Sequence, residues 1–113
     1  MLNDLQKEKL KDQWGERAEA LSCYAIIRLY DPISNWQAFM VAMNPHNEDE
    51  VLCIISAHSK LPPEVTIWSM QEIQSLFNEK GEGVKIDDFF RPRLASDVLK
   101  KLRSLLDYDV ARN

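Results

Sequence analysis

The two cysteines and two histidines are the residues best suited to covalent or metal chemistry in this chain of 113 residues. A nucleophilic thiol needs a neighbouring base, and Cys53 and His58 are the nearest such pair along the sequence. Five positions along a regular strand place two side chains on opposite faces, so we do not expect this pair to act together. The four residues also lack the C-x₂-C or H-x₃-H spacing of a zinc site. We therefore expect buried, reduced thiols and no catalytic residue, metal or cofactor.

Adjacent carboxylates are the next candidates, because two of them can share a proton in acid–base chemistry. Asp87 and Asp88 would point to opposite sides of an extended strand, which is poor geometry for such a pair. We expect Asp87 instead to accept backbone N–H groups or to pair with Arg91 or Arg93. A carboxylate buried beside Arg28 would change that interpretation, so Arg28 and Asp87 remain a candidate polar site.

Basic residues gather near the end of the chain. Residues 85–113 hold seven Lys or Arg and five Asp or Glu, whereas the whole chain has a net charge of −4. The pattern fits contact with nucleic acid or an acidic partner, or simply the solvated face of a helix. The candidate basic patch is Arg91, Arg93, Lys100, Lys101 and Arg103.

Aromatic rings are frequent near the expected turns. Most of them are expected in the core, but surface Trp and Tyr are typical anchors of protein interfaces. Trp36 and Tyr30 are the rings we expect to be partly exposed, because they flank a turn. The interaction candidates are Tyr30, Asn35, Trp36 and Trp68.

These residues need a sheet to position them. Asp31, Pro32, Ser34 and Asn35 are turn formers between two apolar runs, which predicts a β-hairpin. Its first strand should place residues 23, 25, 27 and 29 on one face. With strands at 51–57 and 65–68, the sequence predicts an antiparallel β-meander over residues 23–68.

Helices are expected on either side of this meander. Residues 1–20 form an amphipathic pattern, with an apolar stripe at Leu10, Trp14, Ala18 and Leu21. Residues 69–80 begin with a Ser-x-x-Glu capping box, residues 84–90 resemble a further strand, and residues 94–107 form a last helix. The predicted fold class is α+β: one domain with a mainly antiparallel sheet of 3–5 strands and N-terminal, middle and C-terminal helices.

The composition, with 45% apolar and 28% charged residues, is that of an ordinary globular domain. The charged N-terminal residues include no apolar signal-peptide core, and no apolar run is long enough to cross a membrane. A cytoplasmic protein without membrane contact is expected.

Three blocks of the sequence resemble a small bacterial family of unknown function that is carried on plasmids and integrative conjugative elements. They are the aromatic-x-Pro-x-Ser-Asn-Trp block at 30–36, the Glu…aromatic-Ser-x-x-Glu block at 64–72 and the Asp-x-aromatic-Phe-x-Pro block at 87–92. The chain departs from the family pattern at Ala38 and Thr66. The resemblance implies a compact cytoplasmic α+β domain and an accessory role in a mobile element, but it supplies no catalytic residue.

The function that we predict is non-enzymatic binding of another protein. The first alternative is a nucleic-acid-associated protein that uses the patch at 91–103. The second is a small-ligand or enzymatic module, which requires a pocket near Asp87, Arg28 or His58. A homodimer through the apolar face of the first helix is also left open.

Overall fold

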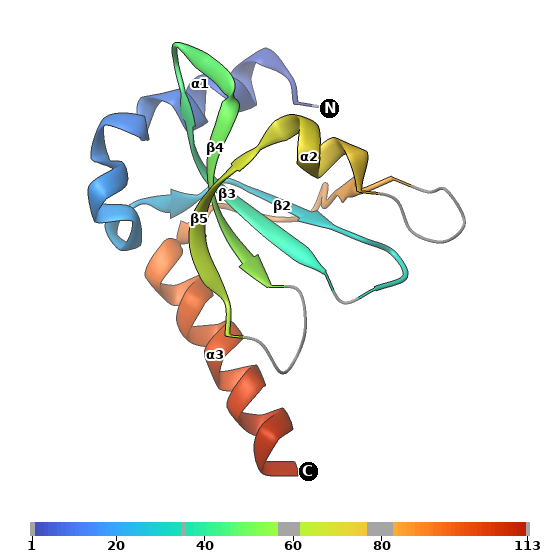
Figure 1. Cartoon of the computed structure of the whole chain (residues 1–113). Coiled ribbons are helices and arrows are strands. Elements are labelled where there is room, and N and C mark those ends of the chain that lie inside the picture. The colour runs from blue at the N-terminus through green and yellow to red at the C-terminus, as the bar shows by residue number, and fades with distance from the viewer. Residues whose placement is uncertain (1, 35, 57–61, 77–82, 113) are drawn as a thin grey trace.

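The protein folds into a five-stranded antiparallel sheet with helices on both faces, and a small two-stranded sheet lies beside it (Figure 1). The computed structural model describes residues 2–34, 36–56, 62–76 and 83–112, with residues 105–112 described by their backbone alone. The strand orders are β5-β4-β3-β2-β6 and β1-β7. The elements are α1 (Asp4–Asp12), the 3₁₀ helix η1 (Trp14–Ser22), β1 (Tyr24–Ala25), β2 (Ile27–Tyr30), β3 (Gln37–Asn44), β4 (Asn47–Ser56), β5 (Glu64–Ser69), α2 (Met70–Ser75), β6 (Lys85–Ile86), β7 (Arg93–Leu94) and α3 (Ala95–Arg112). The predicted α+β fold is confirmed.

The hairpin between β2 and β3 is organised by Asp31. Its Oδ1 accepts the backbone N–H groups of Ile33 at 2.9 Å and Ser34 at 3.3 Å, and its own N–H donates to the Trp36 carbonyl at 3.1 Å. This Asx-type turn is the one that the sequence predicts. It aligns Tyr30 with Gln37 and fixes the register of the two strands.

The sheet is buried on both faces, and the core therefore has two layers. One layer places β2, β3 and β4 side chains such as Leu29, Met40 and Cys53 under α1 and α2. The other layer places side chains such as Phe39 and Ile54 under α3 and η1. A register shift between Met40 and Ala42 is a β-bulge, which lets Val41 and Ala42 both join the α3 layer.

The first predicted strand does not keep one face. Cys23 and Ala25 belong to the α3 layer, whereas Ile27 and Leu29 belong to the opposite layer. The reason is a break at Ile26, where β1 leaves the large sheet and pairs with β7. The alternation of side chains along the sequence cannot reveal this change of sheet. Up to the break at Ile26, the side chains alternate as they do in an uninterrupted strand.

The N-terminal helix is also divided. The α-helix begins after the Asn3 cap and ends at Asp12, and a 3₁₀ helix follows with a non-helical residue at Glu19. Gln13, at the junction, uses its side-chain amide to bond both backbone groups of Tyr24 and the Val41 carbonyl. Leu10 of the predicted stripe is fully buried, whereas Leu21 is 48% exposed.

The middle and C-terminal elements differ from expectation mainly in length. Ser69 caps α2 by accepting the Glu72 N–H at 3.3 Å, as predicted, but the Glu72 carboxylate accepts the Trp68 indole N–H rather than completing the capping box. The expected helix to residue 80 is shorter in the structure: α2 ends at Ser75, because its C-cap Leu76 is extended. Residues 77–82 lie outside the described part. The strand expected over 84–90 is reduced to β6, and the helix expected over 94–107 is α3.

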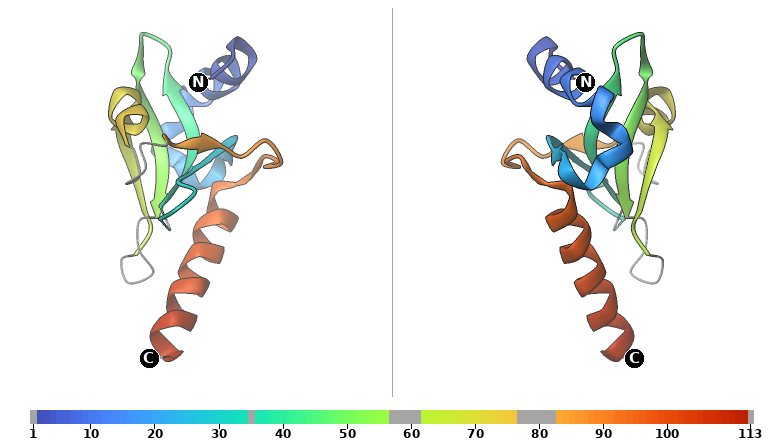
Figure 2. Two further views of the ribbon diagram at one scale, coloured as in Figure 1. Left: turned by 90° about the vertical axis from the view of Figure 1, so that its right-hand side faces the viewer. Right: turned by 90° about the vertical axis from the view of Figure 1, so that its left-hand side faces the viewer.

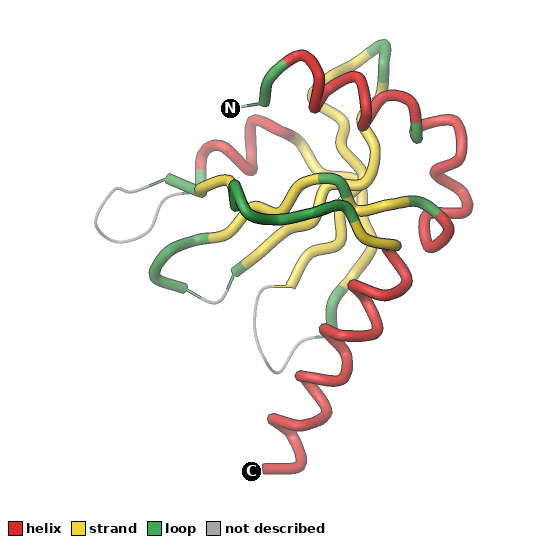
Figure 3. Tube along the Cα trace, turned by 180° about the vertical axis from the view of Figure 1, so that it is seen from behind, coloured by secondary structure: helices red, strands yellow, loops and turns green. Residues whose placement is uncertain are grey.

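The segment between β6 and β7 and the edge strand β5 lie on opposite sides of the molecule (Figure 2). Seen from behind, the chain runs from β6 along the back of the sheet to β7 and then enters α3 (Figure 3). Among the described helices, none is both long and apolar enough to cross a membrane.

Candidate functional site

A large concave surface lies between β2–β3, the β6–β7 segment and the first half of α3. This α3 groove has a volume of about 1010 Å³. Its residues come from five elements and the turn at 87–92, so only the folded chain assembles it. Aromatic, basic and acidic side chains all line it: Tyr24, Phe39, Phe89, Phe90, Arg28, Arg91, Arg93, Lys101, Asp87 and Asp97, together with Gln37, Leu94, Val98 and Leu102.

Arg28 and Asp87, which both line this groove, form an ion pair. Arg28 donates from Nη1 to Asp87 Oδ2 at 2.9 Å and from Nε to Gln37 Oε1 at 2.9 Å. The two charged side chains are 29% and 23% exposed. The guanidinium also lies 5.0 Å from the centre of the Tyr30 ring, a cation–π distance. The predicted pairing of Asp87 with Arg91 or Arg93 is wrong, because Arg28 occupies the carboxylate.

Asp87 also shapes the turn that follows it. Its Oδ1 accepts the Phe89 N–H at 3.0 Å, and its carbonyl accepts the Phe90 N–H at 3.2 Å. The prediction that Asp87 accepts backbone N–H groups is confirmed. The carboxylate is therefore used to hold the turn against the sheet, a structural role.

The turn separates two adjacent phenylalanines. Phe90 packs on Phe39 with ring centres 5.6 Å apart, whereas Phe89 is 94% exposed. Tyr24, on the same groove, is 50% exposed. The sequence does not distinguish Phe89 from the core rings. The only sequence feature that could indicate the exposure of Phe89 is its position directly after two aspartates that form a turn.

The five residues of the predicted basic patch are all exposed but do not form one surface. Arg91, Arg93 and Lys101 line the α3 groove. Lys100 and Arg103 line a separate hollow with Leu21 and Leu99. No ion pair to any of the five is found within the described ranges.

The predicted interaction candidates are also divided. Trp36 and Trp68 are partly buried against the layer under α1 and α2, with ring centres 6.1 Å apart in an edge-to-face arrangement. Tyr30 is partly buried beside Arg28. Asn35 lies outside the described residues.

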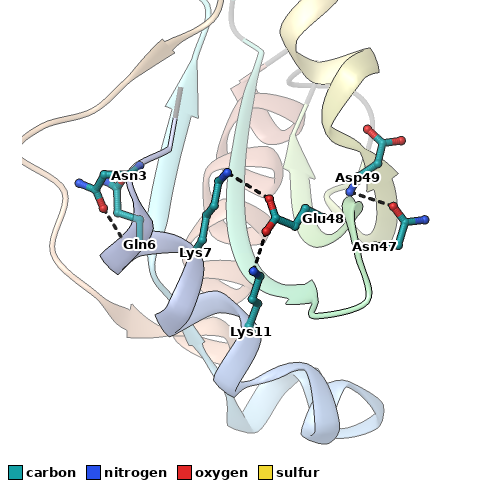
Figure 4. A network of polar contacts seen from close by, with 7 residues as sticks. All are labelled: Asn3, Gln6, Lys7, Lys11, Asn47, Glu48 and Asp49. Carbon is teal, nitrogen blue, oxygen red and sulfur yellow. Dashed lines mark hydrogen bonds and ion pairs between the residues drawn. The ribbon is translucent and has the colours of Figure 1, made fainter.

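A second charged cluster joins α1 to the β3–β4 hairpin (Figure 4). Glu48 accepts from Lys11 Nζ at 2.6 Å and Lys7 Nζ at 3.1 Å, and these contacts lower the pKa of its carboxyl. Asp49 accepts from Ser69 Oγ at 2.7 Å and from the Gln71 N–H at 2.9 Å, which lowers its pKa as well. Both carboxylates connect elements of the fold: Glu48 joins β4 to α1, and Asp49 joins β4 to the start of α2.

The thiols are free and buried. Burial raises the pKa of Cys53 to about 12 and also raises the pKa of Cys23, to which Glu16 and Glu19 add. His46 is exposed in the β3–β4 turn, and His58 lies outside the described residues. Within the described ranges, no three His, Cys, Asp or Glu residues are grouped so that they could hold a metal ion.

Comparison of the chain with protein-family models, with curated proteins and with solved structures finds no match in any of the three. The resemblance carried by the three sequence blocks therefore stays a prediction.

Proposed function

We propose that the protein is a non-enzymatic binding module whose α3 groove holds an acidic segment of another protein that also carries aromatic or aliphatic side chains. The observation that supports this most strongly is Phe89, a ring that is 94% exposed on an ordered turn beside Arg91, Arg93 and Lys101.

An exposed phenylalanine on a fixed turn is prepared for binding. Asp87 holds the turn through the Phe89 N–H and the Arg28 guanidinium. Little conformational freedom is then lost when a partner covers the ring, so more of the contact energy contributes to affinity. Aromatic and arginine side chains are also the ones enriched at the centres of protein interfaces.

The charge of the groove favours an acidic partner. Arg91, Arg93 and Lys101 lie at its surface, while Asp97 is its one acidic side chain outside the Arg28–Asp87 pair. The chain as a whole has a net charge of −4, so this local basic surface stands out against an acidic protein. Opposite charges across an interface guide association and select the partner.

The size and chemistry of the groove favour binding of a segment over catalysis. Its 1010 Å³ lies at the upper end of the roughly 300–1000 Å³ typical of small-molecule pockets. A small-ligand module would need a pocket near Asp87 and Arg28, and this groove provides one. Among the described residues, however, no Cys, His or Ser lines it. Asp87, one of the two carboxylates that line it, is already paired with Arg28.

An accessory role in a mobile genetic element rests on the sequence resemblance alone, and a cytoplasmic location rests on the sequence alone.

A panel of short labelled peptides that vary independently in net charge and in aromatic content tests the proposal. Acidic aromatic peptides should bind, and Arg91→Glu should weaken their binding at least about tenfold by charge repulsion. Lys9→Glu, on the exposed side of α1, changes the total charge equally and should leave affinity unchanged. Equal effects of the two variants would contradict a binding site in the groove.

Single-stranded nucleic acid is the second candidate ligand, because basic side chains and exposed rings line the same groove. Labelled oligothymidine should then bind with an affinity that falls steeply with salt concentration. Binding of the acidic peptides without binding of oligothymidine would exclude this candidate.

A further inference from the structure

The outer edge of β5 is a second exposed surface, far from the α3 groove. β5 is the last strand in the order β5-β4-β3-β2-β6, and within the described residues it pairs only with β4. Figure 2 shows it at one side of the molecule, opposite the β6–β7 segment. An edge strand directs the N–H and C=O groups of alternate residues outward, where another strand can pair with them.

This edge lacks the usual protection against pairing. Natural edge strands often carry a lysine, a proline or a bulge that prevents association. β5 has none of these, since its register with β4 is continuous from Glu64 to Ser69 and its only charged residue is Glu64 at one end. Within the described part of the chain, no other strand pairs with the outer edge of β5.

Two aliphatic side chains beside this edge are incompletely covered. Val65 and Ile67 lie opposite Ile54 and Leu52 of β4, so they extend the core layer that lies under α3. Val65 is nevertheless 38% exposed and Ile67 51% exposed. A shallow hollow between η1, β5 and α3 adjoins Val65, so the apolar surface continues beyond the strand.

We propose that two copies of this chain pair through β5 in antiparallel orientation, about a two-fold axis at Thr66, and join their sheets. Directly opposed residues of an antiparallel pair point to the same face. A register centred on Thr66 therefore places Val65 against Ile67 of the second copy, and Ile67 against Val65 of the second copy.

The strand is complementary to itself in this register. One face gains two aliphatic pairs, and the other gains a threonine pair at the axis. Glu64 lies opposite Trp68 of the second copy, so the two Glu64 residues are about 13 Å apart at the strand spacing of about 3.3 Å per residue. No like charges meet, and a single patch serves both partners, as two-fold symmetry requires.

Sedimentation of the full chain over a range of concentrations tests the proposal. The wild-type chain should reach a dimer, and Ile67→Lys should raise the dissociation constant at least tenfold, because it places a charge against Val65 of the second copy. Ile33→Lys is the matched control, since Ile33 is 52% exposed in the β2–β3 turn, and it should dimerise as the wild type does. A wild-type chain that stays monomeric, or an Ile67→Lys variant that dimerises equally well, would overturn the proposal.

Cysteine cross-linking tests the register independently. Opposed Cα atoms in antiparallel strands are about 4.5–5.5 Å apart, within the range that a disulfide spans. The test uses a Cys53→Ala background, because Cys53 lies opposite Thr66 on β4 and could otherwise pair with the new thiol within one chain. Under mild oxidation Thr66→Cys should give a covalent dimer in this background, whereas Glu64→Cys should not; the remaining native thiol, Cys23, is buried. Faster cross-linking of Glu64→Cys would overturn the register. Neither assay involves the α3 groove, so a result that contradicts the dimer leaves the proposed binding site in the groove untouched, and the reverse also holds.

Discussion

Asp87 connects the sheet to the turn that presents Phe89. Its two oxygens are used differently, since Oδ2 pairs with Arg28 and Oδ1 accepts the Phe89 N–H. Arg28 is in turn oriented by Gln37 on the neighbouring strand. The exposed ring is thus supported by a short chain of hydrogen bonds that begins in the sheet.

Replacing Asp87 by Asn tests this support. An amide retains an acceptor for the Phe89 N–H but loses the charge that pairs with Arg28, so we expect a loss of about 0.5–1.5 kcal/mol in the free energy of unfolding. Chemical denaturation measures the loss. Asp88→Asn is the matched control, because Asp88 is exposed, and it should change stability by less than about 0.5 kcal/mol. Equal effects would mean that the ion pair does not stabilise the turn.

Cys53 should make stability depend on alkaline pH. Burial raises its pKa from the usual 9.0 to about 12, so the unfolded thiol ionises first as the pH rises. The unfolded chain then releases a proton that the folded chain retains, and the free energy of unfolding falls between about pH 9 and 12. Cys53→Ala should be less stable at neutral pH but should show a shallower alkaline decline. Parallel pH profiles for the two proteins would disprove the assignment.

At the scale of elements, α1 is joined to the β3–β4 hairpin by Leu10 on the inside and by Glu48 on the outside. Leu10 is fully buried in the layer that it shares with Met43 and Val51. Glu48 binds Lys7 and Lys11, which lie one turn apart on the helix. The Glu48 carboxylate therefore adds an attachment on the surface to the one that Leu10 makes in the core.

Acid should weaken this attachment. The folded-state pKa of Glu48 lies below its usual 4.5, so its stabilising effect is present above that pH and is lost as the pH falls through the lowered value. Glu48→Gln should therefore lose less stability than the wild type between neutral and acid pH. Denaturation at several pH values measures the difference. Glu8→Gln, an exposed change on α1 itself, should keep the wild-type profile.

The elements that local sequence specifies were predicted well, and those that depend on distant contacts were not. The β2–β3 hairpin and the Ser69 cap follow from residues within a few positions of one another. The end of α1 depends on Gln13 bonding Tyr24 and Val41, and the break at Ile26 depends on β7. No periodicity within either segment carries that information.

For the molecule as a whole, the sequence indicated the components of the site but not their arrangement. The sequence predicts Arg28 and Asp87 as a candidate polar site, and Arg91 and Arg93 as part of a basic patch. That Lys100 points to a different hollow from Lys101 depends on how α3 lies against the sheet, which no local pattern encodes. The exposure of Phe89 likewise depends on the turn fixed by Arg28, distant in sequence.

Titration of an acidic aromatic peptide into the wild type and Phe89→Ala tests the central claim most directly. Phe89 is almost fully exposed, so its truncation should leave the fold intact while removing the anchor of the groove. We expect affinity to fall at least about tenfold, the effect of an interface hot spot, and Ile33→Ala to have no effect. Unchanged affinity of Phe89→Ala would contradict the claim that the α3 groove is the binding site.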